Sequence, residues 1–147
     1  MNTPKSPWRR LKAELARENL IPSSVRDEFT ALKQESFDFL MNIIERRDGT
    51  SRQLRNALLM ASKMRGWGRA RFTLTLPGLC EHEDIKVRTT ALRILVLWLK
   101  QARASPAERI EGYDERSFDE PINKALALGV DEGTAYLARK YLDPPAE

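Results

Sequence analysis

The sequence is poor in the residues that form disulfides and metal sites, with one cysteine, Cys80, and one histidine, His82, among 147 residues. A single cysteine excludes an intramolecular disulfide, and a chain without disulfides is typical of a reducing compartment, so we expect the protein in the cytoplasm. Zinc sites made of four cysteines, of two cysteines and two histidines, or of three histidines are excluded unless several carboxylates are recruited. We therefore expect no metal and no cofactor.

Long hydrophobic runs are missing as well. The longest, Ile94 to Leu99, has six residues, whereas a helix that spans a bilayer needs about 20. Residues 1–12 contain two prolines and four cations but no apolar stretch of the kind found in secretory signals. We therefore expect no membrane partner.

Glycine and proline are also few, with seven and eight residues, while 41% of the chain is hydrophobic and 31% is charged. These values are typical of a folded protein and argue against a disordered or fibrous one. The length suits a single core. The sequence therefore predicts one domain over residues 1–142, followed by a tail over residues 143–147.

Signals for helix ends are frequent, and signals for strands are nearly absent. The expected N-terminal caps are Ser6, Ser23 or Ser24, Thr50 with Gln53, Asp84, Ser105 with Glu108, Ser117 with Glu120, and Asp131. The apolar spacing then predicts helices from Pro7 to about Asn19, Val25 to Arg47, Thr50 to Gly66 and Ile85 to about Ala102, a short helix after Pro106, and helices from Ser117 to about Leu128 and from Asp131 to Tyr141. Within them, the Ile94–Leu99 run predicts the central and most buried helix.

One stretch, residues 67–82, fits two patterns. Apolar residues alternate with polar ones from Ala70 to Leu76, as in a strand, while Phe72, Leu76, Leu79 and Cys80 have helical spacing. A strand here has no partner elsewhere in the chain. We therefore favour a helix bent at Pro77 and Gly78, which gives an all-α fold.

The segment His82–Leu95 carries an ordered motif. Asp84 stands at a turn, Val87 and Arg88 follow three and four residues later, and Ala91 comes three residues after Arg88, followed by a leucine. This pattern resembles the turn and second helix of a HEAT repeat, and Leu76–Leu79 resembles the first helix of the same repeat. The resemblance implies that residues 76–99 form an antiparallel helix pair in which Val87 and Ala91 face the partner helix.

Weaker echoes of the motif occur at Leu54–Leu58 and at Asp131–Ala138, at unequal spacings. The resemblance thus implies a short HEAT-like α-solenoid, and an irregular helical bundle is the alternative. HEAT-like proteins are mostly protein-binding scaffolds, and some bind DNA.

Positive charge is concentrated in the middle of the chain. Residues 46–75 hold eight cations and one anion, against seven and seven in residues 1–45 and ten and thirteen in residues 76–147. Helical spacing places Arg52, Arg55, Leu59 and Lys63 on one exposed face, opposite Leu54. The predicted contact residues of this basic patch are Arg52, Arg55, Lys63, Arg65, Trp67, Arg69 and Arg71. Such a patch binds acidic protein surfaces or phosphates, or it solvates one face while Trp67 fills the core.

No catalytic residues are predicted. Cys80 and His82 point in different directions on a helix, and Glu81, Glu83 and Asp84 are explained by the helix that starts there. The segment Gly66–Gly68 lacks the strand and the other residues of a phosphate-binding loop.

We therefore expect a non-enzymatic, HEAT-like scaffold or adaptor that binds a protein with an acidic surface. The alternative is a nucleic-acid-binding protein that uses the same patch, as in HEAT-like alkylpurine DNA glycosylases. An enzyme of another kind is the third hypothesis. The sequence leaves the oligomeric state open.

Overall fold

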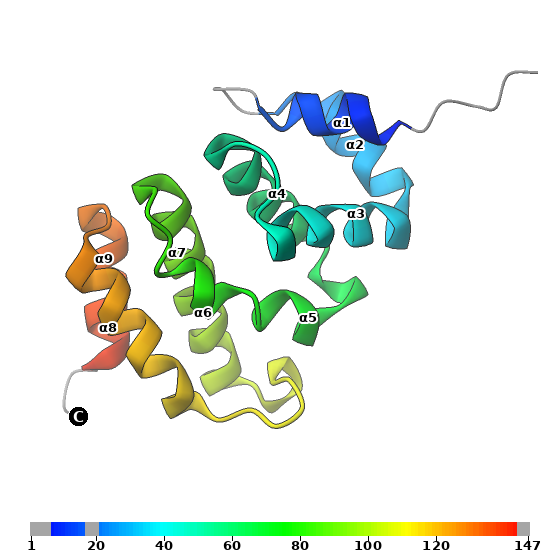
Figure 1. The fold of residues 1–147 in the computed structure, drawn as a ribbon. Helices are drawn as coiled ribbons and strands as arrows, with labels where there is room; N and C mark the ends of the chain where they lie inside the picture. The colour runs from blue at the N-terminus through cyan, green and yellow to red at the C-terminus, as the bar shows by residue number, and fades with distance from the viewer. Residues whose placement is uncertain (1–6, 17–20, 144–147) are drawn as a thin grey trace, which may run out of the picture. The chain divides into compact units, whose positions relative to one another are not determined.

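The structure is a computed structural model that describes residues 7–16 and 21–143. Every regular element in these ranges is a helix, which confirms the predicted all-α class (Figure 1). None of the helices there combines the length and hydrophobicity needed to cross a membrane. The chain divides into two compact units, Met1–Gly68 and Arg69–Glu147, which are described separately. A solenoid and a single domain over residues 1–142 stay predictions, and the expected tail beyond Asp143 lies outside the described residues.

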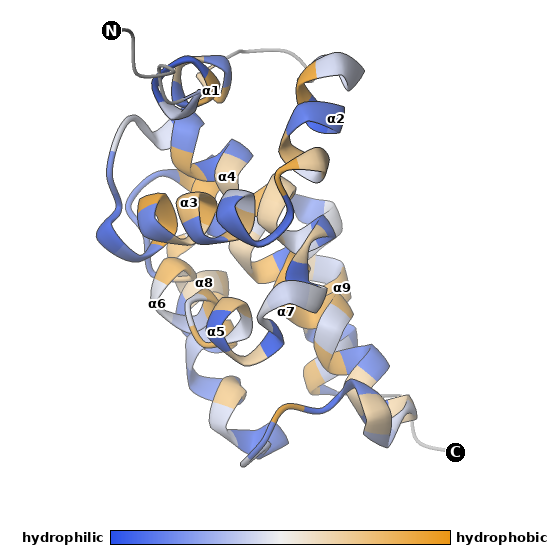
Figure 2. Ribbon diagram, turned by 90° about the vertical axis from the view of Figure 1, so that its right-hand side faces the viewer, coloured by the Kyte–Doolittle hydropathy of each residue, from blue (hydrophilic) through white to orange (hydrophobic). Residues whose placement is uncertain are grey.

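The first unit contains four α-helices and a 3-10 turn. They are α1 (Trp8–Glu14), α2 (Ser23–Ala31), α3 (Lys33–Arg46), α4 (Ser51–Lys63) and η1 (Arg65–Trp67). Figure 2 shows that α3 and α4 carry both hydrophobic and hydrophilic residues. These two helices pack against each other, and both contain fully buried leucines such as Leu40 and Leu58. The expected cap Ser6 and the expected helix end Asn19 lie outside the described residues.

The single helix expected from Val25 to Arg47 is wrong, because the chain breaks into α2 and α3 at Leu32. Lys33 follows with a left-handed backbone, φ 52°, and this conformation interrupts a right-handed helix. The expected serine caps are wrong too, since Pro22 is the N-cap residue and Ser23 already belongs to α2. The break places Phe39 of α3 against both Trp8 and Phe29, at ring-centroid distances of 4.8 and 6.4 Å.

Helix α4 starts with the predicted cap, and side chains of its first turns also hydrogen-bond to the end of α1. The Thr50 hydroxyl accepts the Gln53 N–H, and the Gln53 side chain accepts the Thr50 N–H, which is a capping box. The Gln53 amide donates as well to the Lys12 carbonyl (2.9 Å), and the buried Asn56 donates to the Leu15 carbonyl. Carbonyl groups at the end of a helix lack intrahelical partners, so these two amides of α4 satisfy the end of α1.

The second unit is organised around one long helix. Its elements are α5 (Arg69–Thr73), α6 (Leu76–Leu79), α7 (Ile85–Ala104), η2 (Pro106–Glu108), η3 (Glu115–Phe118), α8 (Asp119–Leu128) and α9 (Glu132–Leu142). Helix α7 packs against α6, α8, α9 and η2, which confirms its central place. Asp84 caps it by accepting the Lys86 and Val87 N–H groups. Leu97 is 43% exposed, however, so the predicted burial of the whole Ile94–Leu99 run is wrong at this position.

The helical reading of residues 67–82 is confirmed, but the position of the bend is wrong. The interruption falls at Leu74 and Thr75, between α5 and α6, whereas Pro77 and Gly78 lie inside α6. Proline is tolerated in the first turn of a helix, where its missing N–H has no partner to lose. The Thr75 hydroxyl donates to the Phe72 carbonyl at 2.6 Å at the end of α5.

The expected cap at Ser117 is also wrong. Asp114 accepts the Arg116 N–H at 3.1 Å and starts the 3-10 turn η3, and the Ser117 hydroxyl donates back to the Asp114 carbonyl at 2.6 Å. Helix α8 then follows Phe118 without a side-chain cap. Asp131 caps α9 as predicted, by accepting the Thr134 N–H at 2.7 Å.

A buried arginine joins two loops of the second unit. The Arg88 side chain, 6% exposed, donates through Nε to the Gly129 carbonyl (2.7 Å) and through Nη2 to the Leu128 carbonyl (3.3 Å) at the end of α8. Its Nη1 donates to the carbonyls of His82 (2.8 Å) and Glu83 (3.2 Å) before α7. Arg88 therefore ties the turn before α7 to the turn after α8.

Cys80 lies at the end of α6 and is fully buried. Burial, with a smaller contribution from the charge of Glu81, raises the pKa of its thiol to about 12. Because the thiolate is the reactive form, we expect modification by a disulfide reagent at pH 8 to be on the order of a thousandfold slower in the native protein than in the denatured chain. Spectrophotometry of the released thiol measures both rates, and comparable rates would contradict the buried position.

Candidate binding surface

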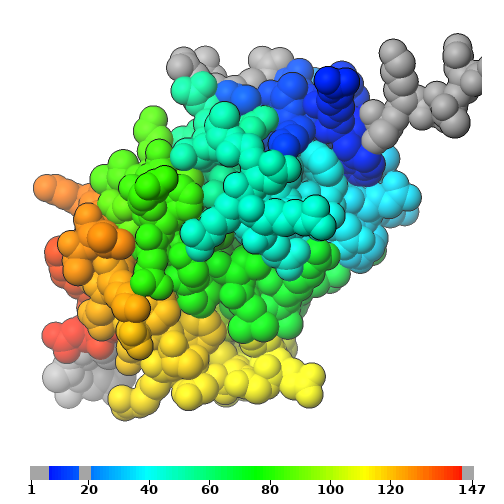
Figure 3. All heavy atoms as spheres, viewed as in Figure 1, coloured from blue at the N-terminus to red at the C-terminus, as the bar shows by residue number. Residues whose placement is uncertain are grey.

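The basic patch is formed in the first unit by one face of α4. We call Arg52, Arg55, Leu59 and Lys63 the basic stripe, since their spacing of three or four residues places them along one side of the helix. Arg52 and Lys63 are exposed, Arg55 is half-buried and Leu59 is 40% exposed. Helix α4 contains no acidic residue. Figure 3 shows α4, in teal, on the surface that faces the viewer.

Two arginines of the basic stripe also have structural contacts. Arg52 donates to the Ala16 carbonyl (3.2 Å), beyond the end of α1, and Arg55 donates to the Asn56 side chain (3.3 Å). Both of these acceptors are uncharged groups. Lys63 is exposed in the last turn of α4, so it is the cation of the stripe best suited to test binding without affecting the fold.

The one acidic residue of residues 46–75, which we call the basic segment, is Asp48, and it is held by another helix. Asp48 forms an ion pair of 2.9 Å with Lys12 of α1. The hydrogen bond from Lys12, together with its charge, lowers the pKa of the Asp48 carboxyl group. Asp48 is thus paired with a cation outside the basic segment.

Trp67 follows the basic stripe in the turn η1. Its side chain is 48% exposed, which disfavours the interpretation of Trp67 as a core residue. Close packing occurs at Gly68 instead, where a Cβ atom would lie 2.7 Å from Cε2 of Phe37. Arg65 of the same turn is half-buried. Trp67 and Leu59 are therefore exposed apolar side chains in the basic segment.

The predicted contact residues belong to both units. Arg52, Arg55, Lys63, Arg65 and Trp67 lie in the first unit, whereas Arg69 and Arg71 lie in the second. Arg69 donates to the Ala107 carbonyl (3.1 Å) and lies 3.7 Å from the Glu108 carboxylate, and Arg71 is half-buried. We therefore take the candidate site as the basic stripe with Trp67.

The residues considered for catalysis have structural roles. His82 accepts the Asp84 N–H through Nδ1 at 3.0 Å, while Cys80 is buried. Glu81 forms an ion pair with Lys124 (3.2 Å), which also pairs with Glu120 (3.1 Å). In the described residues, no group of three or more histidine, cysteine or acidic side chains is placed to hold a metal ion.

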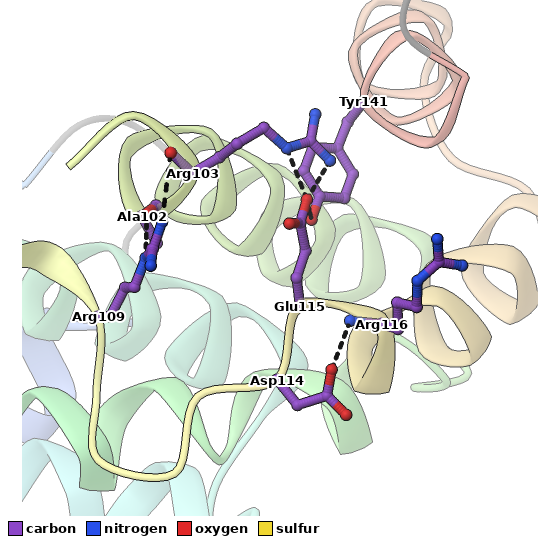
Figure 4. A network of polar contacts seen from close by, with 7 residues as sticks. All are labelled: Ala102, Arg103, Arg109, Asp114, Glu115, Arg116 and Tyr141. Carbon is purple, nitrogen blue, oxygen red and sulfur yellow. Dashed lines mark hydrogen bonds and ion pairs between the residues drawn. The ribbon is translucent and has the colours of Figure 1, made fainter. Parts of the chain in front are cut away.

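A polar network that the sequence did not indicate closes one end of the second unit (Figure 4). The Glu115 carboxylate accepts hydrogen bonds from Arg103 of α7, with Nε at 2.6 Å, and from the Tyr141 hydroxyl of α9 at 2.9 Å. Burial alone would raise the pKa of Glu115, but these hydrogen bonds and the charge of Arg103 lower it. Arg109 donates to the Ala102 carbonyl near the end of α7. The network joins α7, η3 and α9, so its polar groups have a structural role.

Comparison with known proteins assigns no family. No family model, curated protein or solved structure matches this chain. The basic stripe on the surface of α4 is therefore the basis of the proposed function.

Proposed function

We propose that the protein is a non-enzymatic binding module, a HEAT-like scaffold or adaptor of the cytoplasm that recognises an acidic surface of another protein. The observation that carries the proposal is the exposed Leu59 between Arg55 and Lys63, on a helix without acidic residues. An apolar side chain surrounded by charged ones is the arrangement of a protein interface, where a buried centre contributes most of the affinity. Tryptophan is enriched at such centres, and Trp67 extends the candidate surface.

Binding is expected to depend on the basic stripe and to be separable from stability. The variant Leu59→Ala with Lys63→Ala should weaken partner binding about tenfold or more, because it removes an apolar contact and a charged one. The temperature of unfolding should change little, since exposed residues contribute little to folding. Affinity capture from nuclease-treated lysate, followed by titration of the captured protein, measures the effect.

A matched control is Arg26→Ala, which removes an exposed cation of α2 outside the stripe. It should leave partner binding unchanged. The proposal is wrong if nuclease treatment abolishes all capture, or if the control weakens binding as much as the stripe variant does.

Nucleic-acid binding is the second candidate, because the first unit holds thirteen cations and eight anions. Phosphate contacts release counterions, so the logarithm of the affinity should fall linearly with the logarithm of the salt concentration. Fluorescence anisotropy with a short DNA duplex tests this. Between the two, the exposed Leu59 at the centre of the stripe favours a protein partner, since apolar side chains gain little from a phosphate backbone.

A further inference from the structure

The second unit carries an apolar and acidic surface at the end where Arg88 joins its loops. Ile85, the first residue of α7, is 51% exposed, and Leu128, the last residue of α8, is 55% exposed. The hydrogen bonds of Arg88 hold their two turns together, and Figure 1 shows the α8–α9 connection beside the start of α7. The two exposed apolar residues therefore belong to one surface.

Acidic residues lie close to these two residues along the chain. We call Glu83, Ile85, Leu128, Asp131 and Glu132 the acidic end. Its three carboxylates belong to exposed residues, and Asp131 is held in place by its hydrogen bond to the Thr134 N–H and by the bond from its own N–H to the Thr89 hydroxyl. The exposed cations of α7 near this end are Lys86 and Arg93. Acidic residues thus outnumber exposed basic ones here.

The acidic end is the complement of the basic stripe. Each has exposed aliphatic carbon at its centre, with cations around Leu59 in the first unit and carboxylates around Ile85 and Leu128 in the second. We propose that the occupant of the acidic end is a second copy of this chain, docked through its basic stripe. This inference rests on the proposed role of the basic stripe in protein binding.

The distribution of charge determines which faces meet. A contact between two identical basic stripes would bring like charges together, and the same holds for two acidic ends. The contact is therefore between unlike faces, with the basic stripe of one copy on the acidic end of another, and it either closes reciprocally between two copies or continues into rings or open chains. In helical-repeat proteins, stacking of this kind continues wherever the terminal surfaces are not capped.

Two variants, each with one face altered, test the inference. The stripe variant carries Leu59→Gln and Lys63→Glu, and the acidic-end variant carries Glu83→Lys and Glu132→Lys. By sedimentation velocity, the average mass of the wild-type protein should rise above that of a monomer with concentration and should fall as salt is added. Each variant alone should stay a monomer, whereas an equimolar mixture should form a dimer and stop there, because one working face remains on each copy.

Circular dichroism establishes that the variants are folded, and Glu83→Gln with Glu132→Gln is the milder substitute if charge reversal prevents folding. A wild-type protein that stays monomeric at all concentrations overturns the inference, as do single variants that associate like the wild type or a mixture that forms no dimer. If the wild-type protein is monomeric but captures another protein from nuclease-treated lysate, and this capture depends on Lys63, this inference is overturned and the proposed function is supported. If the protein associates with itself but captures no other protein, this inference is supported and the proposed recognition of another protein is contradicted.

Discussion

Replacing Arg88 with methionine should lower the free energy of unfolding by about 3 kcal/mol. Arg88 is buried and donates four hydrogen bonds to the carbonyls of two loops. A fully buried carbonyl left without a partner costs about 1 to 3 kcal/mol. The four acceptors here are part-buried and cost less each, and part of the cost is offset because the guanidinium no longer has to leave water. Methionine preserves most of the apolar volume, so the loss is attributed to the hydrogen bonds. Urea unfolding followed by circular dichroism measures the change.

Two further variants show whether geometry or charge is responsible. Arg88→Lys retains the charge, but its single nitrogen cannot reach both loops, so we expect a loss of about 2 kcal/mol. Arg93→Met, at an exposed position of the same helix, should change the free energy of unfolding by less than about 0.5 kcal/mol. Equal effects at Arg88 and Arg93 would show that Arg88 does not join the loops.

The substitution Trp98→Ala should destabilise the protein by about 3 to 5 kcal/mol, as expected for removal of a large buried side chain. Trp98 is 2% exposed, and its ring makes edge contacts with Tyr113 and Phe118 at centroid distances of 5.7 and 5.8 Å. Its Nε1 donates to the Glu108 carbonyl at 3.0 Å. The expected loss is a large part of the stability of an ordinary domain, and it is measured by urea unfolding with circular dichroism as the signal.

The neighbouring Leu97 is the matched control. It belongs to the same helix and is 43% exposed, so Leu97→Ala should cost less than about 1 kcal/mol. Trp98→Phe retains the aromatic contacts but loses the hydrogen bond, and we expect an intermediate cost of about 1 to 2 kcal/mol. A larger effect at Leu97 than at Trp98 would mean that α7 buries its other side.

Helices whose ends are fixed by neighbouring residues were predictable from the sequence. The capping box of Thr50 and Gln53 and the caps at Asp84 and Asp131 all form, because each side chain reaches N–H groups only two or three residues away. Such contacts depend on local chain geometry, which the order of residues determines.

The break between α2 and α3 had no such signal. The apolar spacing from Phe29 to Phe37 continues across it, and Lys33 is a residue type that rarely takes a positive φ. The change of direction allows Phe39 to pack between Trp8 and Phe29, so it is explained by contacts with a distant segment. The error at Ser117 has a different, local cause, because Asp114 accepts the Arg116 N–H and starts the 3-10 turn η3 before Ser117.

The candidate site was predictable only in part. The spacing of Arg52, Leu59 and Lys63 on α4 indicated a common face, since helical periodicity alone decides it. The contact of Arg52 with Ala16 depends on where the end of α1 lies, and the half-burial of Arg55 depends on tertiary packing. The role of Arg88 in joining the turn at His82 to the turn at Gly129 could not be derived either, because the motif that contains it specifies only the residues around one turn.

The acceptors of Arg88 are all main-chain oxygens, and every amino acid supplies such an oxygen. The side chains of His82, Glu83 and Leu128 are thus free to change over evolution without loss of these bonds, whereas the arginine is not. Gly129 is the exception among the acceptors, since its φ of 103° is a conformation that other residues rarely adopt. In related sequences we expect the equivalents of Arg88 and Gly129 to be retained while the surface residues around them vary. New binding specificities could then arise without loss of the hydrogen bonds that join the two turns.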